Sequence, residues 1–167
     1  MPVNLASSAA LGLLLLLATS AAVIDLRRMI IPDLITLALA LSGLVAALLL
    51  PSRGIVEALF GILAGGGGVY ALRAAHRRLR GIEGLGLGDV KFVAAGGAWT
   101  GLDGLPAFLL VAALFGLGYV ALRAMLRRPF AGGEPMPFAP FLAGGLIMIA
   151  ACQTAGGSSV YDLLLSF

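Results

Sequence analysis

Two aspartates, Asp25 and Asp89, are the residues of this sequence with the clearest potential for chemistry. Asp25 follows 24 residues without a charged side chain, and Asp89 precedes the uncharged run 92–102. An ionisable side chain at membrane depth is costly, so it is a candidate for function. Two carboxylates that face each other can share one proton, so that one acts as a base toward water and the other as an acid. The pair of carboxylates therefore predicts an enzyme that uses water to hydrolyse its substrate.

Each aspartate also has a structural interpretation. Asp25 can form an ion pair at the membrane interface with Arg27 or Arg28, which follow it closely. Asp89 can cap the helix that begins beside it, after a flexible loop. The sequence leaves these structural alternatives open. They are strongest when Asp25 or Asp89 is considered without the other.

The remaining acids are interpreted as structural or solvated. Asp33 comes directly after Pro32, a pattern typical of a helix start, where a carboxylate is favoured by free N–H groups and the helix dipole. Four others are expected in turns, loops or an ion pair: Glu57 with Arg53, Asp103, Glu134 and Asp162; Glu83 stays among the acids expected on the cytoplasmic side.

Glycines alternate along the segment that leads to Asp89, from Gly84 through Gly86 to Gly88. In an extended stretch this spacing clears one face of side chains and lets another backbone approach. We therefore expect Gly86, Leu87 and Gly88 to bind an extended peptide beside Asp89. A phosphate site is disfavoured because the Asp89 carboxylate would repel the anion.

Metal and thiol chemistry have few candidate residues. The chain contains one histidine, His76, in an arginine-rich segment, and one cysteine, Cys152, in an apolar segment. A disulfide within the chain and a cysteine-rich zinc site are excluded, and Asp25 with Asp89 would supply only two metal ligands. We expect no metal and no cofactor.

The composition predicts an integral membrane protein with a single domain over residues 1–167. Hydrophobic residues make up 60% of the chain and charged residues 11%, against about 25% charged in soluble domains. This excludes a soluble enzyme and a nucleic-acid-binding domain, and makes the lipid bilayer a partner. The charge-poor runs predict an all-α bundle of six transmembrane helices, over 5–24, 34–51, 55–73, 89–102, 104–123 and 138–153.

The short fourth segment is assigned as a crossing from the distribution of basic residues. With six crossings, every Lys and Arg except Arg53 falls on one side, in the loops 25–33, 73–91 and 123–137. The positive-inside rule makes that side cytoplasmic and both termini external. The first apolar run lacks a basic segment before it, so we interpret it as a retained helix rather than a signal peptide.

Three ordered motifs resemble those of the type IV prepilin peptidases, which are membrane aspartic proteases with a GxGD motif. The motifs run from Asp25 to Asp33, from Gly86 to Gly101 and from Pro137 to Leu142, the last with Ala139 where the family has glycine. The resemblance implies that Asp25 and Asp89 are the catalytic pair. It gives supporting roles to Pro32, Asp33, Lys91 and Pro140; Lys91 could pair with an acid of the site or with lipid phosphate.

The resemblance implies an endopeptidase that removes the short basic leader of prepilin or pilin-like precursors. Cleavage is expected at the cytoplasmic face of the bacterial or archaeal cytoplasmic membrane. Larger members have paired CxxC motifs and also methylate the product; this chain has one cysteine. It is therefore similar to the small, peptidase-only members of Flp or Tad pili. The alternative from the residues alone is a small proton-coupled transporter that uses the same two aspartates.

Overall fold

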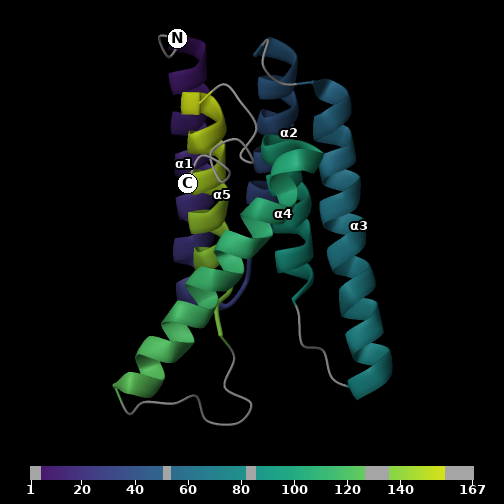
Figure 1. Cartoon of the computed structure of the whole chain (residues 1–167), viewed down its shortest axis with the longest axis vertical. Coiled ribbons are helices and arrows are strands. Elements are labelled where there is room, and N and C mark those ends of the chain that lie inside the picture. Colours follow the sequence, from purple (N-terminus) through teal and green to yellow (C-terminus); the bar gives the residue numbers. More distant parts are fainter. Residues whose placement is uncertain (1–4, 51–53, 82–85, 127–135, 157–167) are drawn as a thin grey trace.

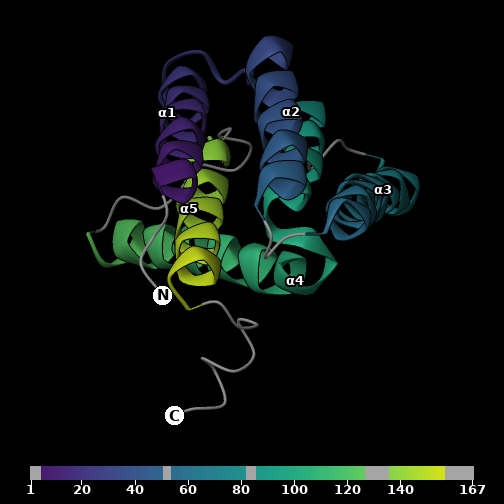
Figure 2. The ribbon, with the colours of Figure 1, turned by 90° about the horizontal axis from the view of Figure 1, so that it is seen from above.

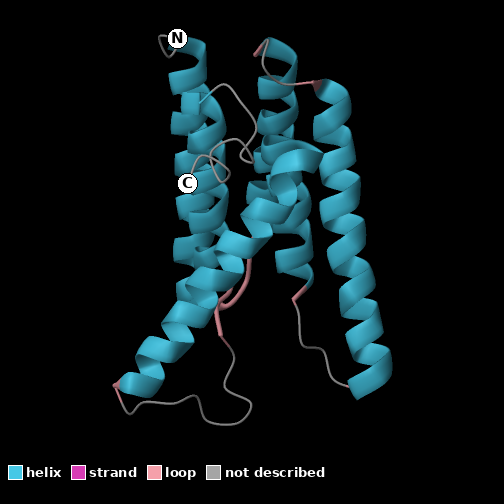
Figure 3. Cartoon of the chain, in the orientation of Figure 1, coloured by secondary structure: helices cyan, strands magenta, loops and turns pink. Residues whose placement is uncertain are grey.

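The computed structural model describes residues 5–50, 54–81, 86–126 and 136–156, and this part of the chain is entirely helical where it is regular (Figure 3). Five helices follow one another along the chain (Figure 1): α1 (Leu5–Arg28), α2 (Asp33–Leu49), α3 (Ile55–Arg80), α4 (Leu87–Met125) and α5 (Ala139–Gly156). By length and composition, α1, α3 and α4 could each cross a membrane, and α2 and α5 are shorter apolar helices. The all-α fold expected from the sequence is confirmed for the described residues.

The described residues form five helices where the sequence predicts six. The predicted segments 89–102 and 104–123 both belong to α4, which contains non-helical backbone at Gly101, with φ 67° and ψ −177°. A residue without a Cβ adopts this conformation without a steric penalty, so α4 changes direction there without a separate loop (Figure 1). The side chain of Gln153 supports the break by donating a hydrogen bond from Nε2 to the Thr100 carbonyl, at 3.0 Å.

Several helices also extend beyond the apolar runs that predict them. The first ends at Arg28 instead of residue 24, and the third ends at Arg80 instead of residue 73. Arginine favours helix and reaches water with its long side chain, so a helix need not end where its apolar run ends. Gly81 follows α3 as its C-cap, with a φ of 70° in the left-handed region.

The first half of α4 occupies the centre of the packing. Its residues Phe92 and Trp99 are fully buried, and the Trp99 indole N–H donates a hydrogen bond of 2.9 Å to the Leu39 carbonyl of α2. α3 packs along the same half of α4, and α5 lies between α1 and α4 (Figure 2). The other large, fully buried side chains come from four helices: Leu14, Leu39, Phe108, Leu142 and Leu146.

Glycines allow the backbones of α3 and α4 to touch. A Cβ built on Gly61 would collide with the carbonyl of Gly97, and a Cβ on Gly97 would collide with the carbonyl of Gly61. Small residues give this close approach between helices in lipid, where dispersion replaces the hydrophobic effect as the attractive force. The contact therefore sets the distance between α3 and the first half of α4.

We predict that Gly61→Ala destabilises the protein by about 1–3 kcal/mol, because its methyl group would overlap the backbone of α4. Gly67→Ala in the same helix is the matched control, since a Cβ there meets nothing within 4 Å. It should be neutral or slightly stabilising, because alanine favours helix over glycine. Thermal unfolding in detergent measures both. Equal midpoints for the two variants would contradict the α3–α4 contact.

Candidate active site

A cavity of about 320 Å³ lies where α1 ends and where α2 and α4 begin. Both aspartates singled out in the sequence line it, although they are far apart in the chain and belong to different helices. The lining residues are Asp25, Met29, Ile30, Ile31, Asp33, Gly86, Leu87, Gly88, Asp89 and Lys91. The fold thus brings Asp25 and Asp89 to one cavity.

Asp25 lies in the last two turns of α1 and is only 6% exposed. Its Oδ2 accepts a hydrogen bond of 3.1 Å from the backbone N–H of Ala139, at the start of α5. Among the described residues, no ion pair joins Asp25 to Arg27 or Arg28, and both arginines are exposed. The ion-pair alternative for Asp25 is therefore wrong, and the partner of its carboxylate is a backbone group.

Asp89 is the third residue of α4 and is partly buried. The N-cap position belongs to Gly86, with φ −67° and ψ 147°, so the interpretation of Asp89 as the cap residue is wrong. A Cβ on Gly86 would lie 3.2 Å from Oδ2 of Asp89. The missing side chain of Gly86 thus leaves room for the carboxylate.

The extended stretch predicted before Asp89 is shorter than expected. Leu87 and Gly88 already belong to α4, and only Gly86 of the three has extended backbone. A Cβ on Gly88 would lie 3.1 Å from the Cβ of Ile31 in the α1–α2 connection. The absence of a side chain at Gly88 therefore allows the connection that follows Asp25 to approach the helix that carries Asp89. Gly84 lies outside the described residues.

The α1–α2 connection is a tight turn. The N–H of Met29 donates a hydrogen bond of 2.8 Å to the Asp25 carbonyl, and Met29 has a φ of 53°, in the left-handed region that non-glycine residues rarely adopt. Pro32, with φ −64° and ψ 134°, directs the chain into α2. Asp33 is the first residue of α2, as its position after Pro32 predicts.

Lys91 and Asp33 form an ion pair at the same cavity. Nζ of Lys91 lies 2.6 Å from Oδ1 of Asp33, and the two side chains are 48% and 75% exposed. Of the two roles considered for Lys91, the structure has the pairing with an acid of the site. Because the pair is exposed to solvent, it contributes no more than about 1 kcal/mol to stability. It links the first turns of α2 and α4.

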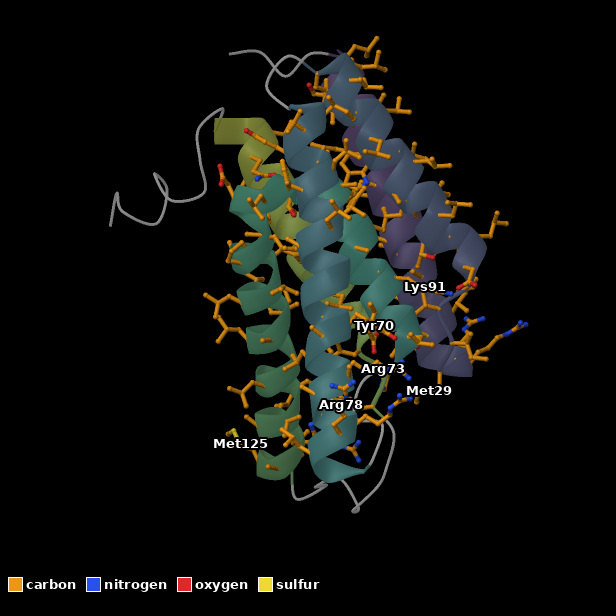
Figure 4. The ribbon with its side chains drawn as sticks, turned by 90° about the vertical axis from the view of Figure 1, so that its right-hand side faces the viewer. Met29, Tyr70, Arg73, Arg78, Lys91 and Met125 are labelled. Atoms are coloured by element: carbon orange, nitrogen blue, oxygen red, sulfur yellow. The ribbon has the colours of Figure 1, made fainter. Side chains whose placement is uncertain are left out.

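The cavity lies at the basic end of the molecule. Figure 4 shows Arg73, Arg78 and Met125 toward the same end as Met29 and Lys91. In the part of the chain that the structure describes, no three His, Cys, Asp or Glu side chains gather as a possible metal site. Six charged residues of the chain lie outside that part: Arg53, Glu83, Arg127, Arg128, Glu134 and Asp162.

The geometry suits acid–base chemistry on a peptide. Two carboxylates on separate helices line a cavity large enough for water and a short stretch of backbone. The sequence analysis missed the Ala139 N–H, because a backbone donor leaves no signature in side-chain chemistry. The signal near it was the motif from Pro137 to Leu142, which includes Ala139 and runs into the first turn of α5.

Comparison with known proteins adds to this geometry. A model of the type IV leader peptidase family matches residues 12–121. The prepilin leader peptidase/N-methyltransferase of Burkholderia pseudomallei strain K96243 is 42% identical over 141 residues, which are 84% of this chain and 45% of the relative. The protein of the same name from Aeromonas hydrophila is 39% identical over 120 residues, 72% of this chain and 41% of the relative.

A shorter relative is covered over most of its length. Leader peptidase HopD of Escherichia coli is 38% identical over 119 residues, which are 71% of this chain and 77% of the relative. The chain therefore spans less than half the length of the two longer relatives but most of HopD. No solved structure matches this chain.

We predict that Gly88→Ala destabilises the protein by about 1–3 kcal/mol, because the added methyl group would press on Ile31. Ile31→Ala in the same chain removes the Cγ1 and Cδ1 atoms that lie 3.4 and 3.5 Å from that methyl group, so it should recover part of the loss. A double-mutant cycle on thermal unfolding measures the coupling between the two sites. Strictly additive effects would show that Gly88 is not required for this contact.

Proposed function

Since this chain belongs to the type IV leader peptidase family, we propose that it is a membrane aspartic endopeptidase for type IV prepilin or pilin-like precursors. Its catalytic residues are Asp25 and Asp89. The observation that carries the proposal is that both line one cavity. They come from different helices, and more than half of the segment that matches the family model lies between them in the chain. The reaction is hydrolysis of the peptide bond between the short basic leader and the mature protein.

The mechanism needs one proton shared by the two carboxylates. The ionised carboxylate removes a proton from a water molecule, whose oxygen attacks the scissile carbonyl carbon. The protonated carboxylate donates its proton as the carbon–nitrogen bond breaks and the amine leaves. Gly86, Leu87 and Gly88 at the start of α4 form the substrate side of the cavity, where the precursor opens into an extended segment.

The proposed topology has six crossings, with both halves of α4 crossing the membrane. The change of direction at Gly101 supports two crossings by this one helix. The basic side chains at the ends of α1 and α3 and at the start of α4 support a cytoplasmic location for the cavity. The precursor leader would then be cut at the cytoplasmic face of a bacterial or archaeal cytoplasmic membrane, with the protein's N-terminus outside.

The proposal is limited to leader cleavage, without methyl transfer. HopD, of which the chain covers 77%, has the name leader peptidase alone. The single cysteine of the chain supports the same limit, because it leaves no paired CxxC motifs in these 167 residues. The chemistry at Asp25 and Asp89 requires no cofactor.

We predict that Asp25→Asn and Asp89→Asn each lower cleavage of a co-expressed prepilin by at least about a hundredfold, because asparagine keeps the shape but cannot exchange the proton. Asp33→Asn, which loses only an exposed ion pair, should lower it by no more than about fivefold. The shift in gel mobility of the precursor measures cleavage, with the membrane level of each variant quantified in parallel.

Asp103→Asn is the matched control for the same substitution, since Asp103 is exposed and does not line the cavity. It should cleave at the wild-type rate. Complete cleavage by the Asp25 or Asp89 variant at normal abundance would contradict the protease assignment and favour proton-coupled transport.

The topology predicts the activity of fusions along the chain. Alkaline phosphatase, which is active only outside the cytoplasm, should be active after Leu50 and inactive after Gly81 and after Leu126. The fusion after Leu126 is decisive for α4, because a single crossing by this helix would place that point outside. A fluorescent protein at the same positions, which folds only in the cytoplasm, should give the opposite pattern.

A further inference from the structure

The buried carboxylate of Asp25 is held by the backbone of α5. At 6% exposure, Asp25 loses most of its contact with water, and a buried carboxylate needs hydrogen-bond donors to replace it. In the described part of the chain, the donor to its Oδ2 is the N–H of Ala139, at 3.1 Å. We propose that Ala139 is the positioning residue of Asp25, acting through this N–H. The inference rests on the proposed function and adds a third helix to its catalytic site.

The start of α5 leaves this N–H available. Ala139 is the first residue of α5, and the first N–H groups of a helix have no partner within the helix. The next residue, Pro140, has no N–H and cannot compete for the carboxylate. The Phe138 carbonyl accepts hydrogen bonds from the N–H groups of Phe141 and Leu142, at 3.1 and 3.2 Å, which closes the first turn. The donor next to Asp25 is therefore the Ala139 N–H.

α5 is packed firmly enough to fix the position of this donor. Ala139 is fully buried, and Leu142 and Leu146 on the same helix are also buried in the core. A Cβ on Gly145 would lie 2.9 Å from the Phe108 carbonyl, so α5 also approaches the backbone of α4 closely. The ring of Phe141 packs against that of Tyr119 of α4, with centroids 5.5 Å apart. The N–H thus belongs to a rigid element.

The contribution of α5 to the site is a backbone dipole. Residues 139–156 include no charged side chain, so no charge from α5 acts on Asp25. The charged side chains that line the same cavity are Asp33, Asp89 and Lys91. Because an N–H group only donates, Oδ2 must present a lone pair to it. An unprotonated carboxyl oxygen is the better acceptor, so this N–H favours the shared proton on Oδ1 of Asp25 or on Asp89.

The direct test replaces the amide at position 139 by an ester, so that the side chain stays the same and only the N–H is lost. Lactic acid in place of Ala139, introduced by cell-free synthesis into detergent or nanodiscs, gives this variant. We expect kcat for prepilin cleavage to fall by about tenfold to a hundredfold, the loss typical of one hydrogen bond to a charged group, with KM changed less than about twofold.

The matched control is the ester at Phe141. It removes the N–H that donates to the Phe138 carbonyl in the same helical turn and leaves the bond to Asp25 intact. It should retain kcat within about twofold. Thermal midpoints of all variants show whether α5 still folds.

Each outcome decides the inference. A lower kcat for the 139 ester alone, with a normal thermal midpoint, supports it. Wild-type kcat for the 139 ester overturns it, as do equal losses for the two esters, which would indicate a structural role for the start of α5. Failure of the proposed function is distinct from these results, because Asp25→Asn and Asp89→Asn would then cleave prepilin as the wild type does.

Discussion

The first half of α4, from Leu87 to Thr100, must be surrounded closely by other helices for this structure to exist. At about 1.5 Å per residue it reaches roughly 20 Å, less than the hydrocarbon thickness of about 30 Å, so its two ends cannot both reach a membrane surface by length alone. α3 touches it backbone to backbone at Gly61 and Gly97, and α2 accepts the hydrogen bond of Trp99. In Figure 1, α3 and the end of α4 extend further than the start of α4, so the first turn that carries Asp89 is recessed between longer helices.

The site is assembled where helix ends meet. α1 ends there, and α2, α4 and α5 begin there, so free backbone N–H and C=O groups collect in an otherwise apolar protein. These groups provide polar partners without additional polar side chains, as the N–H of Ala139 does for Asp25. At Asp89, the missing side chain of Gly86 leaves room for the carboxylate. The position of a buried carboxylate in this setting depends on the positions of whole helices. The packing around α4 therefore also fixes the distance between Asp25 and Asp89.

Much of this arrangement follows from the sequence because hydropathy and charge are local properties. The apolar runs predict the helices, and the basic residues predict the end at which Asp25 and Asp89 gather. Three features could not be predicted from local pattern. The apolar runs predict a break between 89–102 and 104–123, but not that Gly101 makes it without a loop, inside one continuous helix. The pairing of Lys91 with Asp33 depends on two helix starts meeting, and the donor to Asp25 is a backbone group more than a hundred residues away.

The distribution of charge along the helices bears on what kind of chemistry the bundle can perform. A proton pathway through a membrane protein needs ionisable groups at successive depths. Here Asp25, Asp33 and Asp89 lie at one end, while Glu57 in the first turn of α3 and Asp103 after the break in α4 lie at the other. The stretches of helix between these ends, 5–24, 34–49, 58–72, 92–102, 104–122 and 139–156, include no charged side chain. The acids of the described residues therefore lie at the two ends of the bundle and not between them, and Asp25, Asp33 and Asp89 share the end that holds the cavity.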